Sequence, residues 1–322
     1  MIAAEPVSAT TARATAFVAD RRGPAEAFGV SLSDWVNDPD ALAVRLREGL
    51  NGLADPEYLE GQRRIAPGIG TLFGVRWPLM AAVQRGFRRG TRRVRPTPLL
   101  FVADRLFREP ELEIRWFAFG VLGQTLEGEP ERTWQLLRRA ARDAGDWITV
   151  DSLAYPYRDG IRREAYRWAE LEQLVYSPSR WERRLVGSTI ATMTHGRRAA
   201  PDPDFARLAL GLLDLLIGDA EPDVQKALSW AYRSLAQVDL AATTAVLETQ
   251  TDLALGTADG HRAWVIRDAL SKLEPATADR LRNRLTGIRK RPGAPSTSRA
   301  SEVSARFGEL PDPSIHPDPP LA

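Results

Sequence analysis

The sequence predicts an all-α fold. Apolar residues recur every three to four positions along most of the chain, prolines and acidic residues stand where helices would begin, and strict alternation over the length of a strand is absent. Pairs of predicted helices recur every ~35–40 residues, which is typical of a HEAT-like helical-repeat solenoid. A compact, irregular helical bundle is the alternative architecture.

Six segments carry the helical period most clearly: 96–109, 111–127, 131–144, 180–193, 204–218 and 223–236. Three helix starts are marked by a proline beside acidic residues: Asp202-Pro203-Asp204, Glu221-Pro222-Asp223 and Glu274-Pro275. We expect about a dozen helices of 11–18 residues, joined by short turns.

The flanks differ from this repeat region in composition. Residues 1–37 are rich in Ala, Thr, Pro and Arg with weak periodicity, which predicts a loose N-terminal extension. Residues 291–322 are rich in Pro and Ser with few large apolar groups, so they are predicted to be a disordered tail. The helical-repeat domain is therefore predicted over residues 38–290.

Composition excludes several classes of site. The 322 residues contain no cysteine, and the three histidines, His195, His261 and His316, lie far apart in the sequence. A disulfide scaffold, a thiolate metal site, a cysteine nucleophile and a Ser-His-Asp triad are therefore not expected, and neither is a metal or other cofactor. No apolar run reaches the ~20 residues of a membrane span, and no signal-peptide-like start is present. We expect a cytoplasmic monomer.

Charge is distributed unevenly. The net charge of +2 hides a window at 61–105 that holds ten arginines and one acid, Asp104. A local excess of this kind attracts polyanions although the whole chain is nearly neutral. The arginine run at 85–95 has two interpretations. If it faces outward, it would provide a second, non-specific contact to a polyanion. The alternative is that these arginines are ordinary solvent-exposed surface residues without a binding role.

Three clusters combine tryptophan with charged residues. Trp147 and Asp151 lie four residues apart, so they share one helix face. In the second cluster, Arg180 and Arg184 share a helix face beside Trp181. In the third, Lys226, Trp230 and Arg233 lie on one stripe of a predicted helix. Each cluster taken alone is also compatible with a buried tryptophan ring beside solvent-exposed charges.

Taken in order, these clusters resemble the AlkD-like family of DNA alkylation repair proteins, which are HEAT-like alkylpurine DNA glycosylases. The resemblance covers residues 40–275 and rests on five elements: Gly74-Val75-Arg76-Trp77-Pro78-Leu79, Glu113-Ile114-Arg115-Trp116-Phe117-Ala118, Trp147-Ile148-Thr149-Val150-Asp151, Trp181-Glu182-Arg183-Arg184 and 223–233. It implies a solenoid with a concave, basic DNA-binding face, and a lesion that need not be flipped into a pocket.

The resemblance also assigns roles to individual residues. It places Asp151 at the catalytic aspartate, and Trp147 and Trp230 at the tryptophans that contact the sugar and phosphate of the damaged nucleotide. Arg184 and Arg233 match positions that hold the DNA backbone, Lys226 lies in the same motif, and Arg76 falls near the minor groove. Arg180, on the face of Arg184, is a further candidate for DNA binding. The sequence departs from the family pattern at Ile65, where a tyrosine is common, and at Leu79-Met80, where Leu-Arg is usual.

The predicted function is excision of cationic N3- or N7-alkylated purines from duplex DNA, in a nucleoid-associated protein. A purine that already carries a positive charge leaves without protonation, so one carboxylate suffices to stabilise the oxocarbenium-like sugar and to orient water. Two alternatives stay open. One is a HEAT-like module that binds DNA without catalysis, and the other is a scaffold for a second protein.

Overall fold

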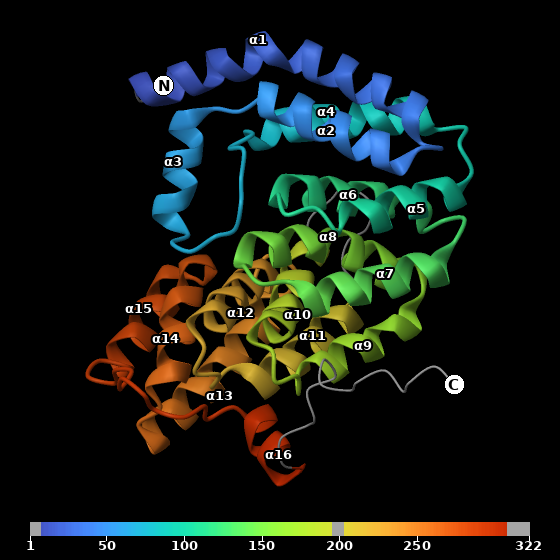
Figure 1. Cartoon of the computed structure of the whole chain (residues 1–322). Helices are drawn as coiled ribbons and strands as arrows, with labels where there is room; N and C mark the ends of the chain where they lie inside the picture. Colours follow the sequence, from blue (N-terminus) through green and yellow to red (C-terminus); the bar gives the residue numbers. More distant parts are fainter. Residues whose placement is uncertain (1–7, 195–202, 308–322) are drawn as a thin grey trace. The chain divides into compact units, whose positions relative to one another are not determined.

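The computed structural model describes residues 8–194 and 203–307 and confirms the all-α prediction (Figure 1). Within these ranges the regular elements are sixteen α-helices and three short 3-10 helices, with one isolated β-bridge between Ala54 and Val75. The chain divides into two compact units, Met1–Ala140 and Ala141–Ala322. The predicted repeat domain of 38–290 spans parts of both units.

The first unit holds α1 (Ala9–Ser31), α2 (Pro39–Gly52), α3 (Pro56–Ile65), α4 (Trp77–Thr91), α5 (Pro96–Leu106), α6 (Leu112–Thr125) and most of α7 (Pro130–Asp143). The second holds α8 (Trp147–Arg163), α9 (Trp168–Leu174), α10 (Arg180–Met193), α11 (Pro203–Leu216), α12 (Pro222–Leu235), α13 (Leu240–Thr257), α14 (Gly260–Ala269), α15 (Pro275–Arg284) and α16 (Arg299–Phe307). The 3-10 helices are η1 (Leu32–Trp35), η2 (Ala165–Arg167) and η3 (Leu270–Lys272).

Local sequence signals fix most helix starts. The predicted prolines open α11, α12 and α15, where the ring sets a helical φ and lacks only an N–H that a first turn leaves unpaired. Aspartates cap α2, α3, α8, α13 and α14 by accepting backbone N–H groups of the first turn. The six predicted segments correspond to α5, α6, α7, α10, α11 and α12: the ends of α10 agree, and the other ends differ by at most three residues.

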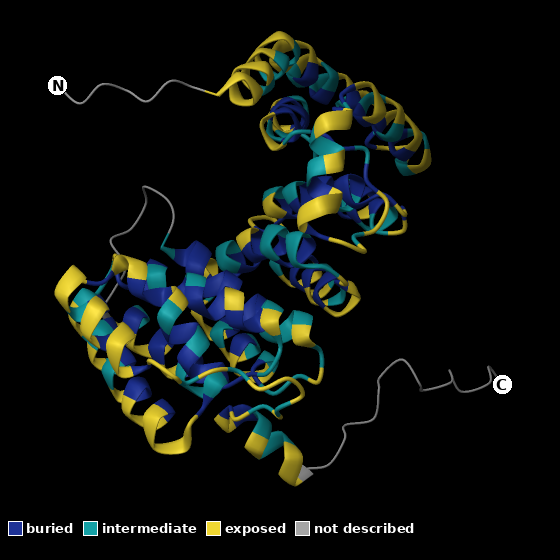
Figure 2. Cartoon of the chain, turned by 90° about the vertical axis from the view of Figure 1, so that its left-hand side faces the viewer, coloured by how far each residue is buried: buried dark blue, intermediate teal, exposed yellow. Residues whose placement is uncertain are grey.

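The N-terminal prediction was wrong for residues 8–37. They form α1 and η1, and α1 packs along α4 (Figure 1). Helical periodicity was weak there because the buried face of α1 carries small residues, Ala25 and Gly29, while its other sides are exposed (Figure 2). Residues 1–7 lie outside the described ranges.

The prediction of a disordered tail was also wrong for residues 291–307. Ser298 caps α16 by accepting the N–H of Ser301 at 3.1 Å, and Thr297 donates its N–H to the Gly218 carbonyl at 2.8 Å. Ser298 and Ala300 are buried. Polar contacts of small residues therefore replace the large apolar groups whose absence suggested disorder, and residues 308–322 of that tail lie outside the described ranges.

Helices of the second unit stack in repeated pairs. The four helices α8, α10, α12 and α14 pack side by side in that order, and α11, α13 and α15 pack behind them in a second layer. The stacked helices run in the same direction, because Asp151 of α8 lies beside Arg184 and Ser188 of α10, while Ala154 lies beside Thr192 further along. The row of α8, α10, α12 and α14 carries the clusters that the sequence singles out.

Candidate active site

Asp146 positions the first cluster at the start of α8. Its carboxylate accepts the backbone N–H of Thr149 at 2.8 Å and the hydroxyl of Thr149 at 2.6 Å. This N-cap makes Trp147 the first helical residue and places Asp151 about one turn further on, on the same face. Both side chains are half-buried.

The carboxylate of Asp151 receives three hydrogen bonds from α10. Arg184 donates Nε to Oδ1 at 3.1 Å and Nη2 to Oδ2 at 2.8 Å, and Ser188 donates its hydroxyl to Oδ1 at 2.6 Å. The side chain of Asp151 stays 22% exposed, whereas that of Arg184 is 6% exposed. Because a carboxylate oxygen can accept about two bonds, Oδ2 keeps room for one more donor or for a cation.

Arg184 also connects α8 and α10 to α12. Its Nη1 donates to the backbone carbonyl of Asp223 at 2.6 Å, and its guanidinium carbon lies 5.8 Å from the centre of the Trp147 ring. Three of its five N–H groups are therefore used inside the protein. Arg184 and Trp147 thus border the carboxylate of Asp151 on adjacent helices.

The third cluster follows one stripe of α12. Lys226 is exposed, and Trp230 and Arg233 are half-buried. Arg233 donates Nη1 to the carbonyl of Asp268 at 2.8 Å and to its carboxylate Oδ2 at 2.6 Å. Only Nη1 is engaged in these bonds, so Arg233 retains further donors toward solvent.

Asp268 belongs to a second Ser–Asp–Arg set, which lies between α12 and α14, whereas the first lies between α8 and α10. Ser229 of α12 donates its hydroxyl to Oδ2 of Asp268 at 2.5 Å, as Ser188 does to Asp151. Burial by itself raises the pKa of Asp268, but the hydrogen bonds from Ser229 and Arg233 and the charges of Arg233 and Lys226 outweigh it and hold that pKa below its usual value.

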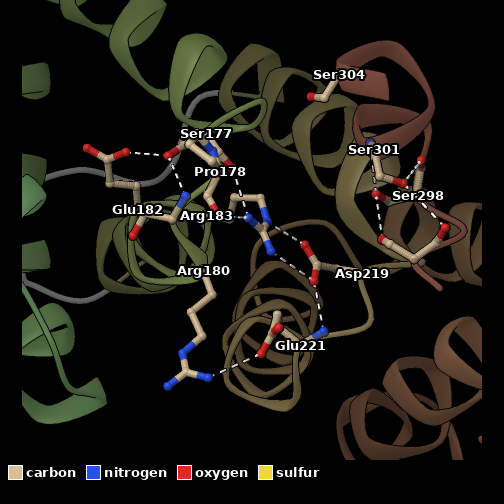
Figure 3. A network of polar contacts seen from close by, with 12 residues as sticks. Ser177, Pro178, Arg180, Glu182, Arg183, Asp219, Glu221, Ser298, Ser301 and Ser304 are labelled. Carbon is tan, nitrogen blue, oxygen red and sulfur yellow. Dashed lines mark hydrogen bonds and ion pairs between the residues drawn. The ribbon is translucent and has the colours of Figure 1, made fainter. Parts of the chain in front are cut away.

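Arg180 takes a different direction from Arg184 at the start of α10. Its Nη1 lies 3.4 Å from the Glu221 carboxylate (Figure 3). Its guanidinium carbon lies 4.6 Å from the centre of the Trp181 ring. The side chain is 48% exposed. Arg180 is therefore a solvent-facing cation on the same helix as Arg184, without a contact to Asp151.

Arg76 belongs to the first unit, whereas the other predicted site residues belong to the second. Its Nε donates to Oδ2 of Asp55 at 2.6 Å, and its guanidinium carbon lies 5.1 Å from the centre of the Tyr58 ring. Burial raises the pKa of Asp55, yet the Arg76 contact and the backbone N–H groups of Tyr58 and Glu57 more than compensate and lower it overall.

Comparison with known families identifies the chain. The model of the DNA alkylation repair enzyme family matches residues 46–273, which is more than half of the sequence. The chain belongs to this family. The resemblance that the motifs indicated is therefore confirmed, and the protein has a role in the repair of alkylated DNA, with DNA as its partner. No curated protein matches the chain.

Two of the five sequence elements on which the resemblance rests are joined by hydrogen bonds in the structure. The buried carboxylate of Glu113 accepts the backbone N–H groups of Phe73 at 3.2 Å, Gly74 at 2.8 Å and Val75 at 3.3 Å. Gly74 has φ of +86°, and a Cβ there would lie 2.5 Å from that of Leu59. Burial raises the pKa of Glu113, although the three N–H groups act in the opposite direction. These residues shape the loop that leads into Arg76.

The departures from the family pattern lie in the first unit. Ile65 is 66% exposed at the end of α3, while Met80 and Leu79 are buried in α4. A charged side chain at position 80 would therefore be desolvated, and Met80 instead packs as a core residue. The arginines of 85–95 are all exposed, and of these Arg85 and Arg89 face Glu26 of α1.

Sequence reasoning missed Ser188 and the Ser229–Asp268 pair. Ser188 stands four residues after Arg184, so helical spacing places both on one face, but a serine inside an apolar helix gives no stronger signal. Asp268 lies 35 residues from Arg233, and only the packing of α12 on α14 brings them together.

No group of three or more His, Cys, Asp or Glu residues is arranged to hold a metal ion in residues 8–194 and 203–307. Over the same part of the chain, no helix combines the length and apolar character that a membrane span requires.

Proposed function

We propose that this protein is a monofunctional DNA glycosylase that excises cationic N3- or N7-alkylated purines from duplex DNA. The observation that carries the proposal is the carboxylate of Asp151. It is half-buried, held by three hydrogen bonds, and left with acceptor capacity on Oδ2. It lies one helical turn from Trp147 and on the row of helices that also bears Trp230.

Cleavage of the N-glycosidic bond generates an oxocarbenium-like sugar. Most glycosidases protonate the leaving group with a second carboxyl group, but a purine alkylated at N3 or N7 already bears the positive charge that makes it a good leaving group. The reaction then requires only that the sugar cation be stabilised and that water attack. Asp151 is the group proposed for both tasks.

Electrostatics sets the expected size of this effect. A unit charge pair about 4 Å apart at an effective dielectric of ~20 is worth roughly 4 kcal/mol, or about three orders of magnitude in rate. The guanidinium of Arg184, 2.8 Å from Oδ2, offsets part of that attraction. If half remains, about 2 kcal/mol still gives a rate increase of about thirtyfold.

The surrounding residues complete the proposed site. The faces of Trp147 and Trp230 would contact the sugar and phosphate of the lesion, and an indole face beside a cation contributes about 0.5–2 kcal/mol. Arg184 would act chiefly by positioning Asp151, with its two remaining N–H groups available to a phosphate. A metal or other cofactor has no part in this scheme.

Backbone contacts would come from the exposed cations. Arg233 and Lys226 on α12 and Arg180 on α10 face solvent near the row of helices that carries Asp151. Arg76 is proposed to contact DNA from the first unit, and the exposed arginine run at 85–95 to give a second, non-specific contact. A concave basic face, monomeric state and location at the nucleoid are parts of the same proposal.

One observation favours a DNA-binding module without catalysis as the alternative. The ion pair between Asp151 and Arg184 links α8 to α10 and, through the Asp223 carbonyl, to α12. Such a pair would also serve a purely structural purpose. In that case Asp151→Asn would lower the free energy of unfolding, and neither the wild type nor the variant would release a base.

Base release from duplex DNA tests the proposal. Duplexes that contain N7-methylguanine or N3-methyladenine are incubated with the wild type and with Asp151→Asn, and abasic sites are counted after alkaline cleavage. We expect release by the wild type and a loss of about 30- to 1,000-fold in the variant. Circular dichroism and duplex affinity of both proteins serve as controls for folding. Absence of release by a folded, DNA-binding wild type would contradict the proposal.

A further inference from the structure

Two of the three lysines in the chain, Lys226 and Lys290, lie near each other in the second unit. Among 44 basic residues, only Lys226, Lys272 and Lys290 are lysines. Lys290 donates Nζ to Oε1 of Gln225 at 2.8 Å, so it lies beside the residue that precedes Lys226. Burial lowers the pKa of Lys290, and the nearby charge of Lys226 lowers it further.

Lys290 is also held against α14. Its Nζ lies 4.6 Å from the centre of the half-buried Trp264 ring, on the helix that carries Asp268. An ammonium group has three N–H donors, and the contacts to Gln225 and Trp264 leave at least one for a ligand. The lysine is therefore fixed in place but still able to bind an anion.

The segment that carries Lys290 is fastened to the body of the unit. We call residues 288–298 the C-terminal strap; it follows α15 and passes α14 and α13 before α16 (Figure 1). His261 Nε2 lies 3.1 Å from the carbonyl of Ala294, and the carbonyl of Gly218 accepts the N–H of Thr297 at 2.8 Å. At Gly260 a Cβ would lie 2.2 Å from the carbonyl oxygen of Arg289, so the strap lies directly on a residue without a side chain.

This corner has an excess of positive charge. Arg289 and Arg291 flank Lys290 in the strap, and both are exposed, as is Lys226. None of these four cations has an ion-pair partner within residues 8–194 and 203–307. Asp268, a carboxylate near enough to feel the charge of Lys226, is bound by Arg233 and Ser229. Neighbouring cations that no ion pair neutralises favour the binding of an anion.

We propose that Lys226 and Lys290 together bind a backbone phosphate of duplex DNA at a distance from the lesion, with Arg289 and Arg291 beside them. This inference rests on the proposed DNA-binding function of the same unit. Helix axes that pack side by side are 8–10 Å apart, so the pair lies on the order of 20 Å from Asp151, about six base pairs along a duplex. The strap follows the matched family region, which ends at residue 273, so it extends the DNA contact beyond that region.

The salt dependence of duplex binding tests this inference. The affinity for an undamaged 24-base-pair duplex is measured by fluorescence anisotropy over a range of salt concentrations. For Lys290→Gln we expect the slope of log affinity against log salt to fall by about 0.9, the value for one phosphate contact. Lys226→Gln and the double variant should show a similar fall, because both lysines share one phosphate. Lys290→Arg should restore the slope.

The chain offers a matched control. Lys272, the third lysine, is exposed in η3 and has no described contact, so Lys272→Gln should leave the slope unchanged. A Lys290→Gln slope equal to that of the wild type would overturn the inference while leaving base release untouched. Equal losses for Lys272→Gln and Lys290→Gln would overturn it too, since they would indicate a diffuse charge effect. Absence of duplex binding by the wild type would refute the inference together with the DNA-binding function.

Discussion

Asp151 and Arg184 bind each other through both carboxylate oxygens, at 3.1 Å from Nε to Oδ1 and at 2.8 Å from Nη2 to Oδ2. Because Nη1 of Arg184 is bound in turn to the Asp223 carbonyl, the arginine cannot rotate without breaking contacts to two helices. The carboxylate is thereby oriented before any substrate arrives. Preorganised charge is commonly the largest single contribution to the stabilisation of a transition state by an enzyme.

A double-mutant cycle should reveal this coupling. Arg184→Ala leaves Asp151 without its partner, and we expect base release to slow by about ten- to hundredfold, since the carboxylate loses its orientation. Asp151→Asn combined with Arg184→Ala should be no slower than Asp151→Asn alone, because the arginine acts through the aspartate. Single-turnover rates at saturating enzyme provide the measurement. Additive losses would contradict a positioning role for Arg184.

Ser188 and Ser229 each donate a hydrogen bond to an aspartate, and their removal should have different effects. Loss of Ser188 should slow base release, whereas loss of Ser229 should weaken DNA binding. Removal of one hydrogen bond of this kind is worth about 1 kcal/mol, so Ser188→Ala should slow base release about fivefold at saturating enzyme. Ser229→Ala removes the equivalent bond to Asp268 and should instead weaken DNA affinity, through Arg233. The two readouts are the single-turnover rate and the dissociation constant. Identical effects of both variants on the rate would argue against a special role for Asp151.

Gly260 should be needed for the position of the C-terminal strap. A methyl group there would meet backbone atoms of Arg289 and Lys290, so Gly260→Ala should lower the free energy of unfolding by about 1–3 kcal/mol. The same variant should reproduce the reduced salt slope of Lys290→Gln. Gly256→Ala in α13 is the control, because its Cβ would meet nothing within 4 Å. Chemical denaturation and duplex titration of both variants make the comparison.

The ion pair of Asp55 with Arg76 should give a pH-dependent contribution to stability. The folded-state pKa of Asp55 lies below its ordinary value of 3.8, so the stabilisation is present in full well above 3.8 and is lost as pH falls through the folded pKa. Asp55→Asn should lower the free energy of unfolding by about 1–2 kcal/mol at neutral pH, and by less as the solution becomes acidic.

A matched cap provides the control for this pH effect. Asp38 caps α2 by accepting the N–H of Ala41 at 3.0 Å but is exposed, so Asp38→Asn, which keeps a capping side chain, should have the smaller effect. Urea unfolding at several pH values compares the variants. A constant difference between wild type and Asp55→Asn down to the acid limit of folding would refute the ion-pair explanation.

Helices and their starts could be predicted because their signals are local. Pro203, Pro222 and Pro275 mark first turns through their own backbone geometry, whatever the helices pack against. The same reasoning failed for α1 and for residues 291–307, which are ordered by small residues and by polar contacts to distant parts of the chain. Thr297 and Gly218, for example, lie 79 positions apart. Their pairing leaves no trace in local periodicity.

The candidate site was predictable only in part for the same reason. Helical spacing joins Trp147 to Asp151, and Lys226 to Trp230 and Arg233. The partners that fix their charges lie on neighbouring helices: Ser188 stands 37 residues from Asp151, and Lys290 stands 65 residues from Gln225. These contacts depend on how the helices stack, which the spacing of single residues does not encode.

Selectivity for cationic bases tests directly whether one carboxylate excises a base without a general acid. Single-turnover release would be measured from two duplexes that differ in one base, N7-methylguanine, which is cationic, or O6-methylguanine, which is neutral. We expect release of N7-methylguanine that falls about 30- to 1,000-fold in Asp151→Asn, with no detectable release of O6-methylguanine by either protein. Comparable release of both bases, or release of N7-methylguanine that does not depend on Asp151, would contradict it.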